Sequence, residues 1–339
     1  MTDPLISIQL TTYNRSGLVQ RAINSLLTQT YPHIRILVCD NGSSDATGPV
    51  IRRITEKDRR VIYTYYPENK EGLKNVTAEI NKIDTPYFSF LSDDDWLLPN
   101  FFEDALKEFK RHPECGFVAL NTRMVDTTGR TIRKSAQYQR WEGYYKPPHG
   151  AVMILEGGFL TWTGILFRKE LIKNIRLWDK ICIINDLSYE LAGALEFPIS
   201  VSAKEGAVFT HHHESFSTTT PLHYVWPCYL ESIAAVNKYC VRYPAIKEYV
   251  NAKLMQRLRR RLLWTGMAGL YRRDAKTAHH VIQILREQFG YKRTECWILA
   301  CFCLLYDVRP EIAVSVLRGI IRNKPRLVSI MDYIGYLRR

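Results

Sequence analysis

Three consecutive carboxylates, Asp93, Asp94 and Asp95, are the residues of this sequence best suited to chemistry. They directly follow the apolar stretch Phe88–Leu91 and Ser92, a composition typical of a buried strand. Adjacent carboxylates repel one another unless a cation lies among them, so their position at the end of a buried strand is costly by itself. An acidic turn in which Asp95 caps the next helix is the simpler interpretation. The sequence upstream favours a cation site instead.

The segments before the triplet are expected to bring further polar groups to the same place. The sequence predicts buried strands over Leu5–Leu10 and Ile34–Cys39, each followed by a polar turn and an amphipathic helix, with Ser16 as the N-cap of the first. A short strand (Val61–Tyr65) and a helix (Leu73–Lys82) continue this alternation, which predicts a parallel sheet with helices on both faces. Ligands bind beyond the carboxyl ends of such strands. Thr12, Asp40 and the triplet are therefore expected to form one site.

The turn after the first strand excludes a dinucleotide site of the Rossmann type. Residues 11–17 read Thr-Thr-Tyr-Asn-Arg-Ser-Gly, without Gly-x-Gly-x-x-Gly, and the sequence contains no Gly-Lys-Ser/Thr. Backbone amides cannot cradle a pyrophosphate in such a turn. A divalent cation held by the triplet would neutralise the pyrophosphate instead.

Three motifs together resemble family 2 glycosyltransferases of the GT-A fold. They are Leu-Thr-Thr-Tyr-Asn-Arg after the first strand, Val-Cys-Asp-Asn-Gly-Ser-Ser-Asp after the second, and Phe-Leu-Ser-Asp-Asp-Asp-Trp-x-x-Pro around the triplet. The resemblance extends over roughly residues 5–220. It implies an α/β fold with a Rossmann-like sheet and flanking helices, and an inverting transfer of sugar from a nucleotide-sugar.

The resemblance also assigns residues to the donor, expected to be UDP-linked. Thr12, Tyr13, Asn14 and Asp40 would hold the nucleobase and ribose, with the Tyr13 ring as a stacking surface and Asp40 as an acceptor. The alternatives are an aromatic residue at the edge of the core for Tyr13 and a helix N-cap for Asp40.

Metal binding falls on the triplet in the same way. The resemblance places Mn²⁺ or Mg²⁺ on Asp94, with Asp93 nearer the ribose and Asp95 in support; hard oxygen ligands suit these ions better than zinc. Ser92 stands where many relatives carry another Asp, which leaves the register open by one residue. A His followed three residues later by Ser in the family matches His212 and Ser215. Three adjacent histidines on a strand cannot all face one metal, because alternate side chains point to opposite faces.

The residues that the resemblance assigns to the acceptor lie further along the chain. Asp186 is expected to be the general base that takes the proton of the acceptor hydroxyl, and the alternative is a helix N-cap. Asn185 stands where the family usually has Glu. Trp162 is expected to face the acceptor. Four aromatic residues are either platforms for a sugar ring or packing of a loop: Tyr138, Trp141, Tyr144 and Tyr145.

The charge of +13 is concentrated at the C-terminal end of the chain. From Val250 onward there are 18 Lys and Arg against 6 Asp and Glu, a net +12, which leaves +1 for the rest. We expect a glycosyltransferase domain over residues 1–220 and a basic helical domain over 221–339, where apolar positions repeat at an offset of 35, as in helix-turn-helix repeats. The basic segment 256–264 would meet anionic lipid headgroups; the alternatives are a solvated face or a homo-oligomer contact. No nucleic-acid recognition module is visible.

Scattered cysteines without a Cys-x-x-Cys pair indicate reduced thiols and a cytoplasmic protein, at most peripheral to the inner face of the membrane. The sequence therefore predicts a metal-dependent glycosyltransferase acting on a saccharide or lipid-linked acceptor in surface polysaccharide synthesis. One alternative is an inactive GT-A-like binding or scaffold protein that works through its basic tail. A nucleotidyltransferase would need a Gly-rich basic loop after the first strand, which Arg15 alone does not supply.

Overall fold

The structure is a computed structural model of the 339-residue chain, and it describes seven segments: 4–68, 78–133, 140–157, 160–175, 185–211, 222–290 and 294–323. The first half of the expected Leu73–Lys82 helix, together with Tyr138, His212 and Ser215, lies outside them. The chain packs as two compact units. The first comprises Met1–Thr210 and Cys228–Lys247, and the second His211–Pro227 and Glu248–Arg339.

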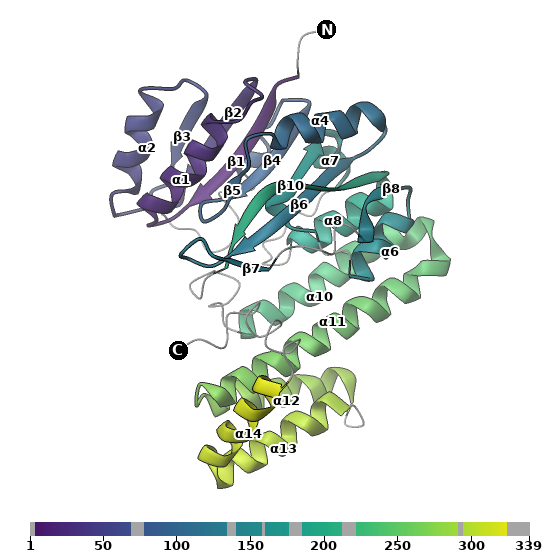
Figure 1. The fold of residues 1–339 in the computed structure, drawn as a ribbon. Helices are drawn as coiled ribbons and strands as arrows, with labels where there is room; N and C mark the ends of the chain where they lie inside the picture. Colours follow the sequence, from purple (N-terminus) through teal and green to yellow (C-terminus); the bar gives the residue numbers. More distant parts are fainter. Residues whose placement is uncertain are drawn as a thin grey trace. The chain divides into compact units, whose positions relative to one another are not determined.

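The first unit is built on one mixed sheet flanked by helices, as expected (Figure 1). Its strand order is β3-β2-β1-β4-β9-β6-β10-β5, with β7 beside β6 and β8 beside β10. The strands are β1 (Ile6–Thr12), β2 (Ile34–Asp40), β3 (Val61–Tyr65), β4 (Tyr87–Ser92), β5 (Trp96–Leu97), β6 (Phe117–Val125), β7 (Thr131–Arg133), β8 (Gly143–Tyr145), β9 (Ile165–Arg168) and β10 (Ile199–Thr210).

Only part of this sheet is parallel. Strands β1 to β4 are parallel, as the alternation of strands and helices predicts, but β9 is antiparallel to both of its neighbours, β4 and β6. The chain passes through β7 and β8 between β6 and β9, and it enters β9 from the short 3₁₀ turn η1 (Trp162–Gly164). This connection is long enough for either strand direction, and β9 runs back along the sheet.

The helices of the first unit cover both faces of the sheet. They are α1 (Ser16–Leu27), α2 (Thr47–Thr55), α4 (Phe101–Arg111), α6 (His149–Leu155), α7 (Glu170–Asn174) and α8 (Asn185–Glu196). One core joins α1, α2 and α4 to residues of β1 such as Ile6, Ile8 and Leu10. The opposite face carries a cluster of aromatic rings from β4, η1, β9 and α8, among them Phe90, Trp162, Phe167 and Tyr189. Side chains that alternate along each strand therefore pack into two separate cores, one on each face of the sheet.

The start of α1 differs from the expected N-cap. Ser16 is the first helical residue, and the cap position is Arg15, whose side chain makes no capping hydrogen bond. The partners come from the start of α2 and the loop before it, because Thr47 Oγ1 accepts from the Arg15 backbone N–H at 3.0 Å and Asp45 accepts from the N–H of Ser16. Partial burial would raise the pKa of Asp45, but hydrogen bonds from Thr47 and Ser16 outweigh it and lower the pKa. The turn after β1 is thus tied to the turn after β2.

The second unit is helical throughout its described residues, as the sequence predicts. The helices of this part of the chain are α10 (Leu222–Tyr239) and α11 (Pro244–Tyr271), which the two units share, followed by α12 (Ala275–Phe289), α13 (Thr294–Val308) and α14 (Pro310–Asn323). Within the described segments, none of the helices has both the length and the apolar character needed to cross a bilayer.

The 35-residue offset has a structural counterpart in this unit. Helix α12 begins at Ala275 and α14 at Pro310, which is 35 residues later. Ala278 and its counterpart Ala313 are both fully buried, so the repeated small residue occupies the same kind of position in each copy. Close approach is also needed on α11, where a Cβ at Gly266 would lie 2.4 Å from Leu299 of α13.

Candidate active site at the carboxyl edge of the sheet

Strand register brings the polar residues of the first three motifs to one edge. Thr12 at the end of β1 pairs with Asp40 at the end of β2, and Thr11 pairs with Ser92, the residue before Asp93. Paired residues of a parallel sheet point to the same face, and the Thr12 hydroxyl donates to Asp93 Oδ2 at 2.7 Å. The expectation that these residues meet at one edge is confirmed.

Arg15 supplies the positive charge at this edge. Its Nη1 donates to Asp93 Oδ1 at 2.9 Å and to Asp94 Oδ2 at 3.2 Å, so a single nitrogen joins two carboxylates. Burial and the charge of Asp94 raise the pKa of Asp93, while Arg15 and the Thr12 hydroxyl oppose this. Burial alone would lower the pKa of Arg15, but the two carboxylates outweigh it and raise it.

Asp95 is a buried structural member of the triplet. It accepts hydrogen bonds from the Thr163 hydroxyl and from the Thr210 backbone N–H, the latter at 2.8 Å. Full burial, followed by the charge of Asp94, raises the pKa of Asp95 well above its usual range. Asp95 therefore does not cap a helix, and α4 begins only at Phe101, after Asn100. It joins the acidic turn to η1 and to the end of β10.

Hydrogen bonds fix the backbone of Asp94, and its side chain is the least buried of the three aspartates. Arg21 Nη2 and the Thr210 hydroxyl both donate to the Asp94 backbone carbonyl, the first at 2.6 Å. Arg21 itself is held 4.2 Å above the Trp96 ring. The Asp94 side chain is 13% exposed, against 6% for Asp93. Of the triplet, Asp94 is thus the carboxylate best placed to meet a ligand.

Asp40 is completely buried, and both of its oxygens have partners. The Ser43 backbone N–H donates to Oδ1 at 2.9 Å and the Tyr63 hydroxyl donates to Oδ2 at 2.8 Å. It does not cap α2, which begins at Thr47. Burial and Asp40 together raise the pKa of Tyr63, which therefore stays protonated and a donor. Each oxygen of Asp40 therefore has one donor and a second acceptor site.

The turn after β1 presents one open aromatic ring. Asn14 has a positive φ of 51°, a conformation that Asn tolerates better than most residues, and its side-chain oxygen accepts from the Ser44 N–H at 2.8 Å. The neighbouring Tyr13 is 44% exposed. Asn14 therefore shapes the turn, while Tyr13 offers a ring face to the surroundings.

Trp162 and Asp186 are linked to the same edge through packing. Trp162 is half-buried and stacks on Phe90, with ring centroids 4.5 Å apart. It also meets Tyr189 edge-on at 5.8 Å, and Tyr189 lies about one helical turn after Asp186 on α8. The next residue, Thr163, holds Asp95, so consecutive contacts lead from the acidic turn through η1 to Tyr189 of α8. The Asp186 carboxylate is exposed there and accepts from the Leu187 N–H at 2.8 Å.

The described aromatic residues of the 137–149 segment lie elsewhere. Tyr145 of β8 pairs with Ile199 at the start of β10, whereas Thr210 of the acidic site is 11 residues further along that strand, on the order of 30 Å away. Tyr144 stacks on His112 at 4.4 Å, and the Tyr145 hydroxyl donates to the Trp141 carbonyl. These contacts are loop packing away from the acidic edge, and the same three aromatic residues also line a cavity of about 410 Å³.

The donor set at this edge suits a hard divalent cation that shares its coordination with a ligand. Within the described segments, no three Asp, Glu, His or Cys side chains are arranged to hold a metal by themselves. Mg²⁺ and Mn²⁺ bound to nucleotides need only one or two carboxylates, because phosphate oxygens and waters complete the shell. Asp94, backed by Asp93, meets that requirement. His212 lies outside the described residues.

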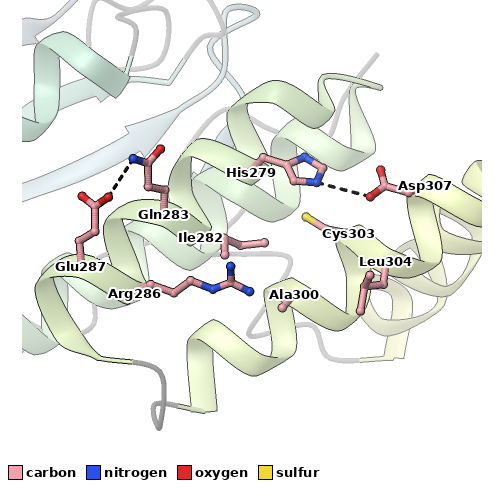
Figure 2. A pocket seen from close by; sticks show the side chains of 9 residues that line it. All are labelled: His279, Ile282, Gln283, Arg286, Glu287, Ala300, Cys303, Leu304 and Asp307. Carbon is pink, nitrogen blue, oxygen red and sulfur yellow. Dashed lines mark hydrogen bonds and ion pairs between the residues drawn. The ribbon is translucent and has the colours of Figure 1, made fainter.

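A cavity of about 460 Å³ lies between α12 and α13 of the second unit (Figure 2). His279 and Asp307 face one another across it at 3.4 Å, and Cys303 lines it. Burial raises the pKa of Cys303 to about 11, so its thiol is protonated and unreactive at neutral pH. The lining also contains Arg286 and Glu287, but its carboxylates are not adjacent in the sequence as those of the acidic edge are.

Several site residues escaped the sequence reasoning. Arg15 could have been found, because it directly follows Asn14 in the first motif, but an arginine before a helix looks like an ordinary surface residue. Arg21, Thr163 and Thr210 carry no local signal, since each acts through a contact far away in the sequence. Thr163 directly follows Trp162, whose aromatic side chain is the stronger sequence signal.

Comparison with known proteins agrees with this geometry. The family model "Glycosyl transferase family 2" matches residues 7–176. Chondroitin synthase of Pasteurella multocida is 31% identical over 130 residues, which is 38% of this chain and 13% of that protein. The matched parts make up between 13% and 42% of the first curated relatives, so the chain spans well under two thirds of their length.

Two solved structures share the fold over nearly the whole chain. S. aureus TarS 1-349 in complex with UDP-GlcNAc has a TM-score of 0.63 at 15% identity, covering 94% of this chain and 92% of that one. Mannosyltransferase PcManGT from Pyrobaculum calidifontis, in complex with GDP-Man and Mn²⁺, has a TM-score of 0.50 at 13% identity, covering 98% and 87%. The fold of the first unit is thus the GT-A fold.

Proposed function

Because the chain belongs to glycosyl transferase family 2, we propose that it transfers a sugar, with inversion, from a UDP-linked nucleotide-sugar to a saccharide or lipid-linked acceptor. The observation that carries this proposal is the convergence of Thr12, Asp40 and Asp93 at one sheet edge, with Asp94 partly exposed beside them. Surface polysaccharide synthesis is the role we infer, and the chondroitin synthase relative supports a polymeric product.

The donor would bind along the turns that follow β1 and β2. Tyr13 is exposed and can stack on the nucleobase. Asn14, through Ser44, holds that turn in place, and Asp40 holds the next turn through Ser43. Thr12 keeps the Asp93 carboxylate oriented toward the ribose end of the site. UDP-GlcNAc in the TarS complex supports a uridine nucleotide as the donor carrier.

The diphosphate of the bound nucleotide-sugar would lie at Asp94. A bound Mn²⁺ or Mg²⁺ offsets the negative charge of the departing diphosphate. Asp94 would hold that ion with its carboxylate. Arg21 and Thr210 fix the Asp94 backbone, and Asp95 holds the same turn through its hydrogen bond from Thr210. His212 is the expected second protein ligand. The Mn²⁺ in the PcManGT complex supports the use of a divalent ion.

Asp186 would act on the acceptor. Inversion requires the acceptor oxygen to attack the anomeric carbon from the face opposite the leaving diphosphate, and a carboxylate must take the hydroxyl proton during that attack. Asp186 is exposed at the start of α8, beside the segment that holds Asp95. Trp162, packed between Phe90 and Tyr189, is the aromatic residue we place at the acceptor.

Calorimetry with UDP, with and without Mn²⁺, tests the proposal. We expect binding that strengthens when Mn²⁺ is present. A panel of nucleotide-sugars, screened by hydrolysis and by thermal stabilisation, then identifies the donated sugar. Absence of metal-dependent nucleotide binding would contradict the enzyme and favour a binding module of the same fold.

A further inference from the structure

Arg15 is the positively charged residue that joins the side chains of Asp93 and Asp94 at the acidic edge. Its Nη1 lies 2.9 Å from Asp93 and 3.2 Å from Asp94, and its side chain is 27% exposed. Two carboxylates this close repel each other strongly in a partly buried site. The guanidinium therefore provides in the metal-free protein the charge compensation that a divalent cation provides in the loaded one.

The backbone of Arg15 is fixed, so only its side chain can move. Its N–H donates to Thr47 Oγ1 at 3.0 Å, and its carbonyl accepts from the Val19 N–H at 3.0 Å in the first turn of α1. The long, flexible side chain can rotate without disturbing this anchor. Movement of the guanidinium thus requires no change in the fold.

The two carboxylates that Arg15 joins are not equivalent. Asp93 is more buried, receives the shorter bond from Arg15 and also accepts from the Thr12 hydroxyl. Asp94 receives the longer bond, and its side chain is more exposed. A cation that arrives from outside therefore meets the Arg15–Asp94 bond first, while the Arg15–Asp93 bond is protected.

We propose that Arg15 is an internal counter-ion that competes with the divalent cation for Asp94 and makes metal binding depend on the nucleotide. This inference rests on the proposed function. Cation entry releases the guanidinium from Asp94 while it stays on Asp93. A positive guanidinium disfavours a bare metal ion nearby but favours a diphosphate. Metal and nucleotide binding are therefore coupled, and the coupling is reciprocal.

The test measures each ligand separately on the full chain. Mn²⁺ binding is followed by the loss of the free-ion paramagnetic resonance signal, and UDP binding by calorimetry without metal. For Arg15→Gln we expect Mn²⁺ alone to bind tighter by about fivefold or more, because a nearby like charge is removed. We expect UDP alone to bind weaker by about threefold or more, because a charge-assisted contact is lost. A general loss of structure would weaken both.

Arg35→Gln is the matched control, because Arg35 forms an Arg–Asp pair of similar length, 2.8 Å to Asp84, on the surface. We expect no change in either affinity. Arg15→Lys keeps the charge but not the planar fork that serves two carboxylates; its Mn²⁺ affinity should fall between wild type and Arg15→Gln. This variant also keeps the test decisive if Arg15→Gln folds poorly, which far-UV circular dichroism would reveal.

The outcomes separate the two proposals. If wild type binds Mn²⁺ with UDP but the Arg15 variants bind Mn²⁺ alone no more tightly than wild type, the counter-ion inference is wrong and the proposed function stands. If wild type binds no Mn²⁺ even with UDP, the metal-dependent function fails and the inference fails with it. Tighter Mn²⁺ binding together with weaker UDP binding supports both.

Discussion

Asp94 shows how one carboxylate can be positioned by contacts to its own backbone. Arg21 and the Thr210 hydroxyl hold its carbonyl, while its side chain stays partly exposed. The carboxylates on either side accept internal hydrogen bonds, Asp93 from Thr12 and Asp95 from Thr163. Three identical residues thus have three different environments, which the sequence alone cannot distinguish.

For Asp94→Ala we expect loss of metal-dependent UDP binding, because the carboxylate proposed to hold the cation is removed. Calorimetry with UDP and Mn²⁺ measures this. Asp84→Ala is the control, because Asp84 is an exposed carboxylate that pairs with Arg35 on the surface. Unchanged binding in Asp94→Ala would place the cation elsewhere.

For Asp186→Asn we expect donor binding to be retained and transfer to fall by about two to four orders of magnitude, the usual contribution of a positioned general base. The amide keeps an oxygen that can accept from the Leu187 N–H, so the start of α8 should be preserved. Sugar transfer to acceptor and UDP affinity are measured on the same preparation. Near-normal transfer would dismiss Asp186 as the base.

At the scale of elements, the contact of η1 with β6 decides whether Asp95 is held. A Cβ at Gly164 would lie 2.5 Å from the Thr122 hydroxyl and 2.7 Å from the Leu120 backbone carbonyl. Because the carbonyl belongs to a central strand, η1 would have to move away and take Thr163 with it.

We therefore expect Gly164→Ala to lower the free energy of unfolding by about 1–3 kcal/mol, the usual cost of overpacking. Chemical denaturation measures it. Gly17→Ala is the matched control, because a Cβ at that helical position meets nothing within 4 Å; it should be neutral or slightly stabilising. Equal stability of the two variants would show that η1 tolerates displacement.

The N-cap of α12 makes a prediction with a pH dependence. Asp274 accepts from the Thr277 backbone N–H at 3.2 Å and from its hydroxyl at 2.6 Å, and the hydrogen bond from the Thr277 side chain is the main cause of its lowered pKa. A carboxyl whose pKa is lower in the folded state stabilises the protein above its unfolded pKa. That stabilisation is lost as the pH falls through the folded pKa.

We expect Asp274→Ala to cost about 1 kcal/mol of unfolding free energy at pH 7. The difference from wild type should shrink as the pH falls below about 4, the ordinary pKa of Asp. Asp274→Asn keeps a good N-cap without a titrating group, so its advantage over the Ala variant should not change with pH. Thermal melts of the three proteins over this pH range provide the measurement. A gap between wild type and Ala that is constant with pH would refute the assignment.

At the scale of the whole molecule, the chain joins a nearly neutral N-terminal part to a strongly basic C-terminal one. Helix α11 carries Lys253, Arg257, Arg259, Arg260 and Arg261, with Arg260 exposed. An enzyme that uses a lipid-linked acceptor benefits from attraction to anionic headgroups. The alternatives of a solvated face or an oligomer contact predict no preference for lipid charge.

We expect the protein to sediment with vesicles of anionic lipid and to be released as salt is raised, because exposed charges are screened. Vesicles of zwitterionic lipid are the control. Arg257→Gln combined with Arg260→Gln should reduce binding without affecting UDP affinity. Equal retention on both kinds of vesicle, or none on either, would exclude the electrostatic contact.

The sequence by itself determined the order of strands and helices in the N-terminal part, the family and the edge at which the polar turns meet. These are local signals: apolar runs set the strands, polar turns end them, and the carboxyl ends of parallel strands share an edge. The helical nature of the described C-terminal residues also follows from the sequence, because the apolar spacing is local.

Only the tertiary structure decided the direction of β9, the distance of the Trp141–Tyr145 loop from the acidic edge, and the partners of each aspartate. The reason is that these depend on contacts between residues some 50 to 120 positions apart, such as Tyr145 with Ile199 and Thr210 with Asp95. A short window of sequence contains one member of each pair and therefore cannot report the bond between them.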